Sequence, residues 1–88
     1  MLVISRGPGE RVLIGSATLS VRAVSPSVEL VLAEAGKVTD HVFRERDLPQ
    51  NPSIPLKDGR VILQGRHGGR VLLAIDAPRD VRVVRVDE

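Results

Sequence analysis

Residues 60–76 read RVILQGRHGGRVLLAID and contain the clearest hairpin signal of the chain. Apolar residues recur at every second position on both sides of His67-Gly68-Gly69, as in strands with one buried face. Paired glycines accept the positive φ angles of a tight hairpin turn. The stretch therefore predicts two antiparallel strands joined by a short turn.

The same pattern of strands occurs earlier in the chain. Residues 18–45 read as two apolar strands, a turn and a third strand, and residues 60–87 repeat that order. Residue identity between the halves is low, so the repeat is one of pattern. The matching positions are Leu19, Val21 and Ala23 with Val61, Leu63 and Gly65, then Val28, Leu30 and Leu32 with Val71, Leu73 and Ile75. Such a duplication suggests a function that needs two copies of a surface, or a fold that once needed two chains.

The remaining segments also favour strands. Residues 1–5 and 11–14 are apolar and flank a turn with two glycines and a proline, and residues 38–46 form a less regular strand. Residues 48–58 contain Pro49, Pro52 and Pro55, which favour an extended connection. We therefore expect an all-β chain with about eight strands, arranged as a small antiparallel sheet or barrel-like sandwich.

Composition limits the classes of function. The 88 residues suffice for one small domain, and a chain of this size has a modest core that a partner chain would extend. There is no cysteine, which excludes disulfides and thiolate metal sites and suits a cytoplasmic protein. The start of the chain runs directly into a strand pattern, so neither a signal peptide nor a membrane span is expected.

Nothing in the chain predicts an enzyme. His41 and His67 lie in a strand and in a turn, without a nucleophile or a metal-ligand pattern around them, and are expected to be solvent-facing polar residues. The glycine clusters lack the spacing of a phosphate-binding loop and lead into no helix. We expect no catalytic residue, no metal and no cofactor. Phe43 is the single aromatic residue, so RNA binding by aromatic stacking is excluded, whereas 11 of the 13 basic residues are arginines, which suit phosphate and guanine edges.

Both ends of the chain resemble one known family. Residues 1–15, MLVISRGPGERVLIG, resemble the opening of the carbon storage regulator (Csr/Rsm) family of bacterial RNA-binding translational regulators, which begin with a strand, an arginine, a Gly-Glu turn and an Ile-Gly pair. Residues 71–85, VLLAIDAPRDVRVVR, resemble the family's fourth strand, its Ala-Pro loop and a fifth strand that ends in an arginine. Gly7 departs from the pattern, because a second basic residue usually follows the first arginine.

The resemblance implies a fold of interleaved units. Csr-like chains have five strands and dimerise so that the first and last strands of one chain flank the middle strands of the other. In one assignment, residues 1–48 are a first unit, 49–58 a proline-rich linker and 59–88 a second, partial unit. In the other, residues 16–58 are an insertion between strands two and three. With either assignment, the resemblance implies a homodimer, or a monomer that imitates the interleaved dimer.

The resemblance also implies the partner. Family members bind messages or small regulatory RNAs at GGA in hairpin loops or single strands, and so regulate translation and message stability. An antagonist protein is a further implied partner, and the alternative is a Csr-like module that binds a protein through exposed strand edges. The RNA-binding residues carried over are Val3, Ile4, Ser5 and Arg6 in the first strand, Ala77, Pro78, Arg79 and Asp80 in the loop, and Arg85 and Arg44 as strand-five arginines.

Overall fold

The protein is built from strands. The computed structural model describes residues 1–87, which contain nine strands and one short 3-10 helix. In chain order these are β1 (Leu2–Arg6), β2 (Arg11–Ile14), β3 (Ala17–Ala23), β4 (Val28–Glu34), β5 (Lys37–Phe43), η1 (Leu48–Gln50), β6 (Ser53–Leu56), β7 (Gly59–His67), β8 (Arg70–Asp76) and β9 (Val83–Val86). The predicted all-β class is thereby confirmed.

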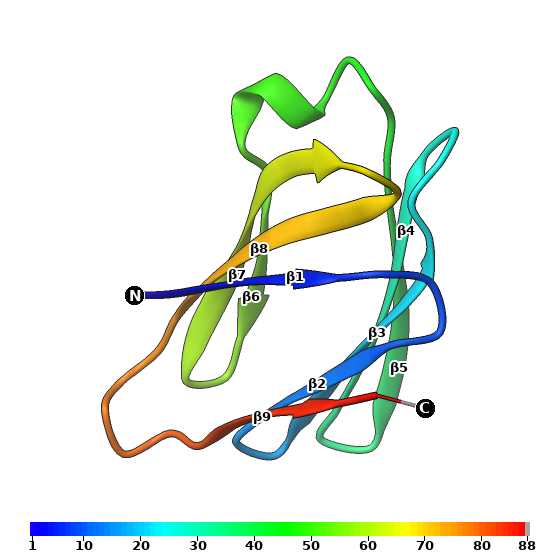
Figure 1. Cartoon of the computed structure of the whole chain (residues 1–88). Coiled ribbons are helices and arrows are strands. Elements are labelled where there is room, and N and C mark those ends of the chain that lie inside the picture. The colour runs from blue at the N-terminus through cyan, green and yellow to red at the C-terminus, as the bar shows by residue number, and fades with distance from the viewer. Residues whose placement is uncertain (88) are drawn as a thin grey trace.

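The strands form two antiparallel sheets that enclose one core (Figure 1). The four-stranded sheet has the order β1-β8-β7-β6, and the five-stranded sheet has the order β5-β4-β3-β2-β9. Two of these pairings cross between the halves of the chain, because β1 pairs with β8 and β9 pairs with β2. The first strand of the chain therefore belongs to the sheet of the C-terminal half, and the last strand belongs to the sheet of the N-terminal half.

The first two strands of the repeated pattern correspond in the structure, whereas the third strands do not, because β5 pairs with β4 and β9 pairs with β2. The strands β2-β3-β4 and β6-β7-β8 follow one another in the same order, and the two-residue turns before β3 and β7 match. Each unit also has an irregularity at the same place, between Val21 and Ala23 in β3 and between Leu63 and Gly65 in β7. The irregularity in β7 lies 42 residues after the one in β3, so β3 and β7 match residue by residue up to and including this position.

One part of the sequence interpretation needs correction. Residues 49–58 were expected to be a connection, yet residues 53–56 form β6, which pairs with β7. Leu48 and Ile54 from this region are buried in the core. A strand tolerates proline here because β6 is at the edge of its sheet, where Pro55 can direct its missing N–H away from the neighbouring strand.

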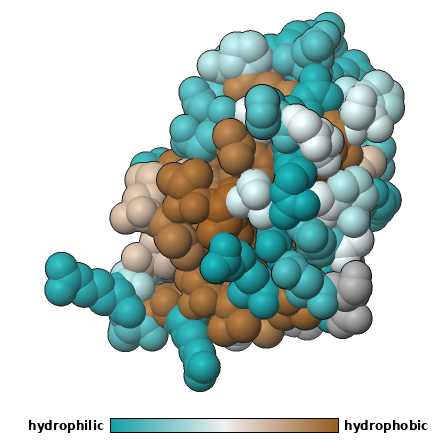
Figure 2. Space-filling model, in the orientation of Figure 1, coloured by the Kyte–Doolittle hydropathy of each residue, from teal (hydrophilic) through white to brown (hydrophobic). Residues whose placement is uncertain are grey.

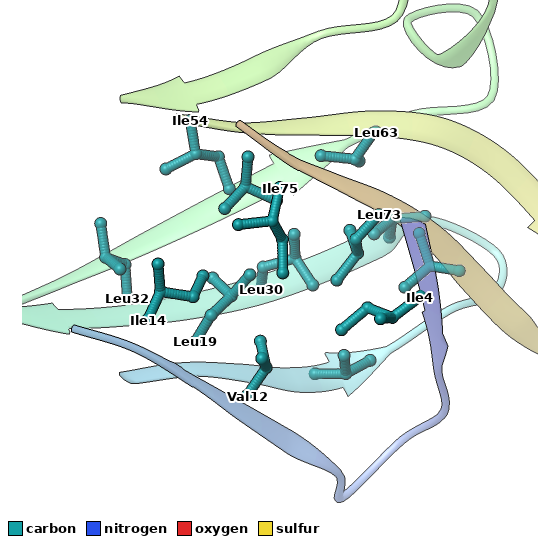
Figure 3. Packing of buried hydrophobic residues seen from close by; sticks show 14 of the residues in the cluster. Ile4, Val12, Ile14, Leu19, Leu30, Leu32, Ile54, Leu63, Leu73 and Ile75 are labelled. Carbon is teal, nitrogen blue, oxygen red and sulfur yellow. The ribbon is translucent and has the colours of Figure 1, made fainter. Parts of the chain in front are cut away.

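The core lies between the two sheets. Buried positions alternate along β2, β3 and β4 and again along β7 and β8. Figure 3 shows these side chains converging from both sheets, with Ile4 of β1 joining them. Full burial of such a side chain contributes about 1.5–3 kcal/mol. The fully buried large residues are Leu19, Leu30, Ile54, Leu63, Leu73, Val12, Val28, Val61 and Val71.

The turn between β4 and β5 contains a strained alanine. Ala35 has φ 53° and Gly36 has φ 75°, as in the primed turns that favour asparagine and glycine. Because a left-handed conformation costs an ordinary L-residue about 1–2 kcal/mol and asparagine less, we expect Ala35→Asn to raise the free energy of unfolding by up to about 1 kcal/mol. Urea denaturation measures this change. A midpoint equal to or below that of the parent chain would show that Ala35 is not strained.

Candidate nucleic-acid interface

Two edge strands from opposite ends of the chain lie close together. β1 is an edge of the four-stranded sheet and β9 an edge of the five-stranded sheet. Their beginnings meet at a depression of about 310 Å³, lined by Met1, Leu2, Ile75, Ala77, Pro78, Arg79, Val81 and Val83. Their ends are joined by an ion pair between Arg6 and Asp87. The two strands therefore run in the same direction (Figure 1), and we call residues 1–6 with residues 77–87 the β1/β9 corner.

The side chains of β1 alternate between the core and the surface. Ile4 is buried in the core, and Arg6, on the same face, is also buried. Val3 is 58% exposed and Ser5 is partly exposed. An edge strand leaves alternate N–H and C=O groups without a neighbouring strand. Because the side chain of Ile4 is buried, Ile4 can offer only main-chain atoms to a ligand.

Arg6 fastens the corner. Its Nε donates to the carbonyl of Ser5 (2.8 Å), and its Nη1 donates to the carbonyl of Arg11 (3.3 Å) and to the carboxylate of Asp87. The Arg6 side chain is only 6% exposed. These contacts give Arg6 a structural role, in which it holds the end of β9 against β1. Arg6 is one of the residues predicted to bind RNA, but its guanidinium is already engaged in these contacts.

A second cluster of charges surrounds the turn after β1. The Gly7 N–H donates to Glu10 Oε1 (2.7 Å), and Arg70 Nη2 donates to the same oxygen (2.8 Å). Arg70 also donates to the hydroxyl and the carbonyl of Ser5. The hydrogen bond from Gly7 is the largest cause that lowers the pKa of Glu10, and Arg70 and Arg6 add to it against partial desolvation. Glu10 therefore stays ionised at neutral pH.

Arg70, which lies beside the end of β1, was not among the predicted residues. A Cβ atom at Gly7 would lie 3.2 Å from Arg70 Nη1, so the guanidinium of Arg70 occupies the space beside Gly7. Its side chain is 41% exposed. The pairing of β1 with β8 brings Arg70 to this position, because Arg70 directly precedes Val71, the register partner of Arg6. That pairing joins residues 65 positions apart and is not visible in a local pattern.

The loop before β9 presents polar groups beside the depression. Ala77 and Val81 pack against the core, whereas Pro78, Arg79 and Asp80 are exposed. The Val81 N–H donates to the carbonyl of Pro78 (3.0 Å), which closes a turn over the exposed residues. The loop is therefore held at both ends and exposed in its middle.

Arg85 lies on the side of β9 that faces the interior of the sandwich. Its register partner in β2 is Val12, which is buried, and Val83 on the same face of β9 packs against the core. Arg85 nevertheless is exposed, because β9 is an edge strand and the core ends there. Its side chain is thus placed on the β1 side of the corner.

The corner combines apolar surface with arginines. Met1, Leu2, Val3 and Val84 are all exposed, and they belong to β1 and β9 or precede them. Figure 2 shows an apolar area in this part of the molecule, with hydrophilic side chains projecting beside it at the lower left. The exposed arginines of the corner are Arg79, Arg82 and Arg85.

The structure places Arg44 elsewhere. Arg44 follows β5, which is the edge of the five-stranded sheet opposite to β9. Its main-chain N–H donates to Asp47 Oδ2 (2.9 Å) in the turn that leads to η1. β5 thus pairs with β4 and does not stand where β9 stands. Of the ten predicted residues, the structure brings nine to the β1/β9 corner and leaves Arg44 apart.

Comparison with known proteins gives no match. No family model fits the chain, and no curated protein or solved structure is significantly similar to it. Residues 1–87 contain no helix that is long and apolar enough to cross a membrane. The same residues contain no group of three or more histidine, aspartate or glutamate side chains placed to hold a metal ion.

Proposed function

We propose that the chain binds RNA at GGA motifs in hairpin loops or single strands, and thereby regulates translation and message stability. The observation that carries this proposal is the meeting of β1, the Ala77–Asp80 loop and β9 at one depression. These are the segments that resemble the Csr/Rsm family, and they come from opposite ends of the chain. A homodimer and a monomer both satisfy the proposal.

The corner offers the groups that recognition of single-stranded RNA needs. Main-chain N–H and C=O groups of two edge strands can read base edges, and the depression between the strands can hold an unstacked base. Arg79, Arg82 and Arg85 supply positive charge on the same surface. Base recognition here relies on main-chain groups and arginine, because Phe43, the single aromatic residue, lies in β5.

A titration of two RNA hairpins tests the proposal. One hairpin carries GGA in its loop and the other carries CCA, and both are titrated with the whole chain at one near-physiological salt concentration. We expect a preference of at least tenfold for GGA, about 1.4 kcal/mol. If three arginines contact phosphates, the logarithm of the affinity should fall with the logarithm of salt concentration with a slope of about −2. Equal and weak binding of both hairpins would contradict the proposal.

A second candidate is binding of a protein strand at β5. Val38 and Val42 are 70% and 54% exposed, and both lie in this edge strand. Exposed apolar residues on a sheet edge favour addition of a strand from another protein. Such binding would depend little on salt, because no counterions are released from phosphates. The salt dependence of a captured partner therefore separates the two candidates.

A further inference from the structure

The sandwich has a second corner that corresponds to the first. β5 pairs with β4 in the same antiparallel sense and register as β1 pairs with β8: Thr39 lies opposite Leu32 as Leu2 lies opposite Ile75. β6 corresponds to β2, since each precedes a two-residue turn and the longer strand of its hairpin. The repeat therefore relates the β1/β9 corner to a β5/β6 corner, made of residues 37–43 and 53–56.

The β5/β6 corner lacks the segments that complete the first one. The chain connects β8 to β9 through the six residues 77–82, but it connects β4 to β5 through Ala35 and Gly36 alone. No loop equivalent to Ala77–Asp80 is therefore present between β4 and β5. Within residues 1–87, β6 pairs with β7 alone, so no strand stands beside it as β9 stands beside β2.

The sequence of β6 disfavours addition of the missing strand. Leu56 and Gly59 flank the two-residue turn and form the hydrogen-bonded pair that closes the hairpin. Pro55 belongs to the next pair, in which the main-chain groups point away from β7 to the free edge. A strand in the place of β9 would therefore meet a residue without an N–H. The matching residue of β2 is Leu13, whose register partner is Val84 of β9.

The charge of the second corner also differs. Glu34 lines a depression there with Leu32, Thr39, His41, Lys37 and Pro55. Its carboxylate accepts a hydrogen bond from the Lys57 N–H (3.1 Å) and so bridges the two sheets. Leu19 pairs with Leu32 as Val61 pairs with Ile75, so the register matches Glu34 with Ala77, which lies in the loop of the β1/β9 corner. Glu34 and Lys37 thus place opposite charges in the second depression, whereas the charged side chain that lines the depression of the β1/β9 corner is Arg79.

We infer that each chain carries a single RNA site, at the β1/β9 corner, and that one chain cannot bridge two GGA motifs of one message. The inference rests on the proposed function. It follows from the asymmetry of the repeat. Of the two corners, the β1/β9 corner has the Ala77–Asp80 loop, the strand β9 beside β2, and Arg85 on that strand, and among the residues that the structure describes the β5/β6 corner has no equivalent of them. If two chains associate, the ratio stays at one RNA for each chain.

Native mass spectrometry of the full chain with the single-GGA hairpin tests the inference. With the RNA in several-fold excess over its dissociation constant, we expect complexes with one RNA for each chain. An RNA with two separated GGA hairpins should bind two chains at saturation and show no enhanced affinity from bridging by one chain. Two RNAs bound specifically to each chain would overturn the inference alone. Absence of a GGA preference would overturn the proposed function, and the inference with it.

A variant gives an independent reading of the same point. Arg85→Ala should reduce specific binding of GGA in a single phase that includes the whole binding signal. A chain with two independent sites would instead keep half of the signal at the parent affinity. Arg46→Ala is the matched control, because Arg46 is exposed in the turn after β5 and its substitution removes the same charge. Persistence of half the signal in Arg85→Ala would overturn the single-site inference.

Discussion

Replacement of Gly59 by alanine should lower the melting temperature of this protein by at least about 10 °C. A Cβ atom at Gly59 would lie 2.3 Å from the carbonyl oxygen of Asp76 and 3.1 Å from Ala77 Cα. Both neighbours are main-chain atoms, so no side-chain rotation relieves the contact. Gly59 also has φ 151°, which L-residues rarely adopt. Strain and overpacking each cost about 1–3 kcal/mol, so we expect a loss of roughly 3 kcal/mol.

Gly65→Ala is the control that separates the two causes. Gly65 has φ 130°, but a Cβ atom there meets nothing within 4 Å. Its substitution therefore carries the conformational cost without the contact. Thermal and urea unfolding of both variants should show Gly59→Ala as clearly the less stable. Equal losses would mean that the contact with Asp76 and Ala77 is relieved by movement of the loop.

The close approach at Gly59 also explains a difference between the two repeats. The residue of the first half that corresponds to Gly59 is Ala17, which directly follows the two-residue turn between β2 and β3. In the second half, the chain leaves β8 and passes over Gly59 as it enters the loop at Ala77. A glycine is needed in the half that has this loop, and not in the half that turns back at Ala35.

Local patterns predicted most of the strands. The alternation around His67-Gly68-Gly69 predicted the β7–β8 hairpin, and the matching positions of residues 18–32 predicted β3 and β4. These signals are reliable because burial on one face of a strand has a period of two. β6 was not predicted, because its four residues include Pro55 and lack a long apolar alternation. Its position at a sheet edge removes the objection to proline, and edge position is a tertiary property.

The arrangement of the candidate site could be predicted only in part, because it depends on contacts between distant parts of the chain. The Ala77–Asp80 loop and Arg85 could be located from their own motif, and the structure brings them to β1. The burial of Arg6 could not be predicted, because its partner Asp87 is separated from it by 81 residues. Arg44 was grouped with Arg85 because the two strands that end the repeats look alike in sequence. The short turn at Ala35-Gly36 instead returns β5 to β4, where it corresponds to a first strand.

Arg85→Ala should weaken binding of a GGA hairpin at least tenfold, about 1.4 kcal/mol. Hydrogen bonds to charged groups contribute about 1.5–3 kcal/mol, and Arg85 is an exposed arginine on the β1 side of β9. The substitution should leave the free energy of unfolding within about 0.5 kcal/mol, because the side chain is at the surface. Arg6→Ala is less informative, since Arg6 is buried and holds Asp87.

Three companion variants make the result specific. Arg85→Lys keeps the charge but loses the planar fork, so an affinity between those of the parent and Arg85→Ala would show that geometry contributes. Arg46→Ala removes an exposed arginine outside the corner and should leave GGA affinity unchanged. Arg44→Ala decides whether the opposite edge of the five-stranded sheet takes part, and we expect it to behave like Arg46→Ala. An Arg85→Ala chain that binds GGA as tightly as the parent would place the RNA site away from the β1/β9 corner.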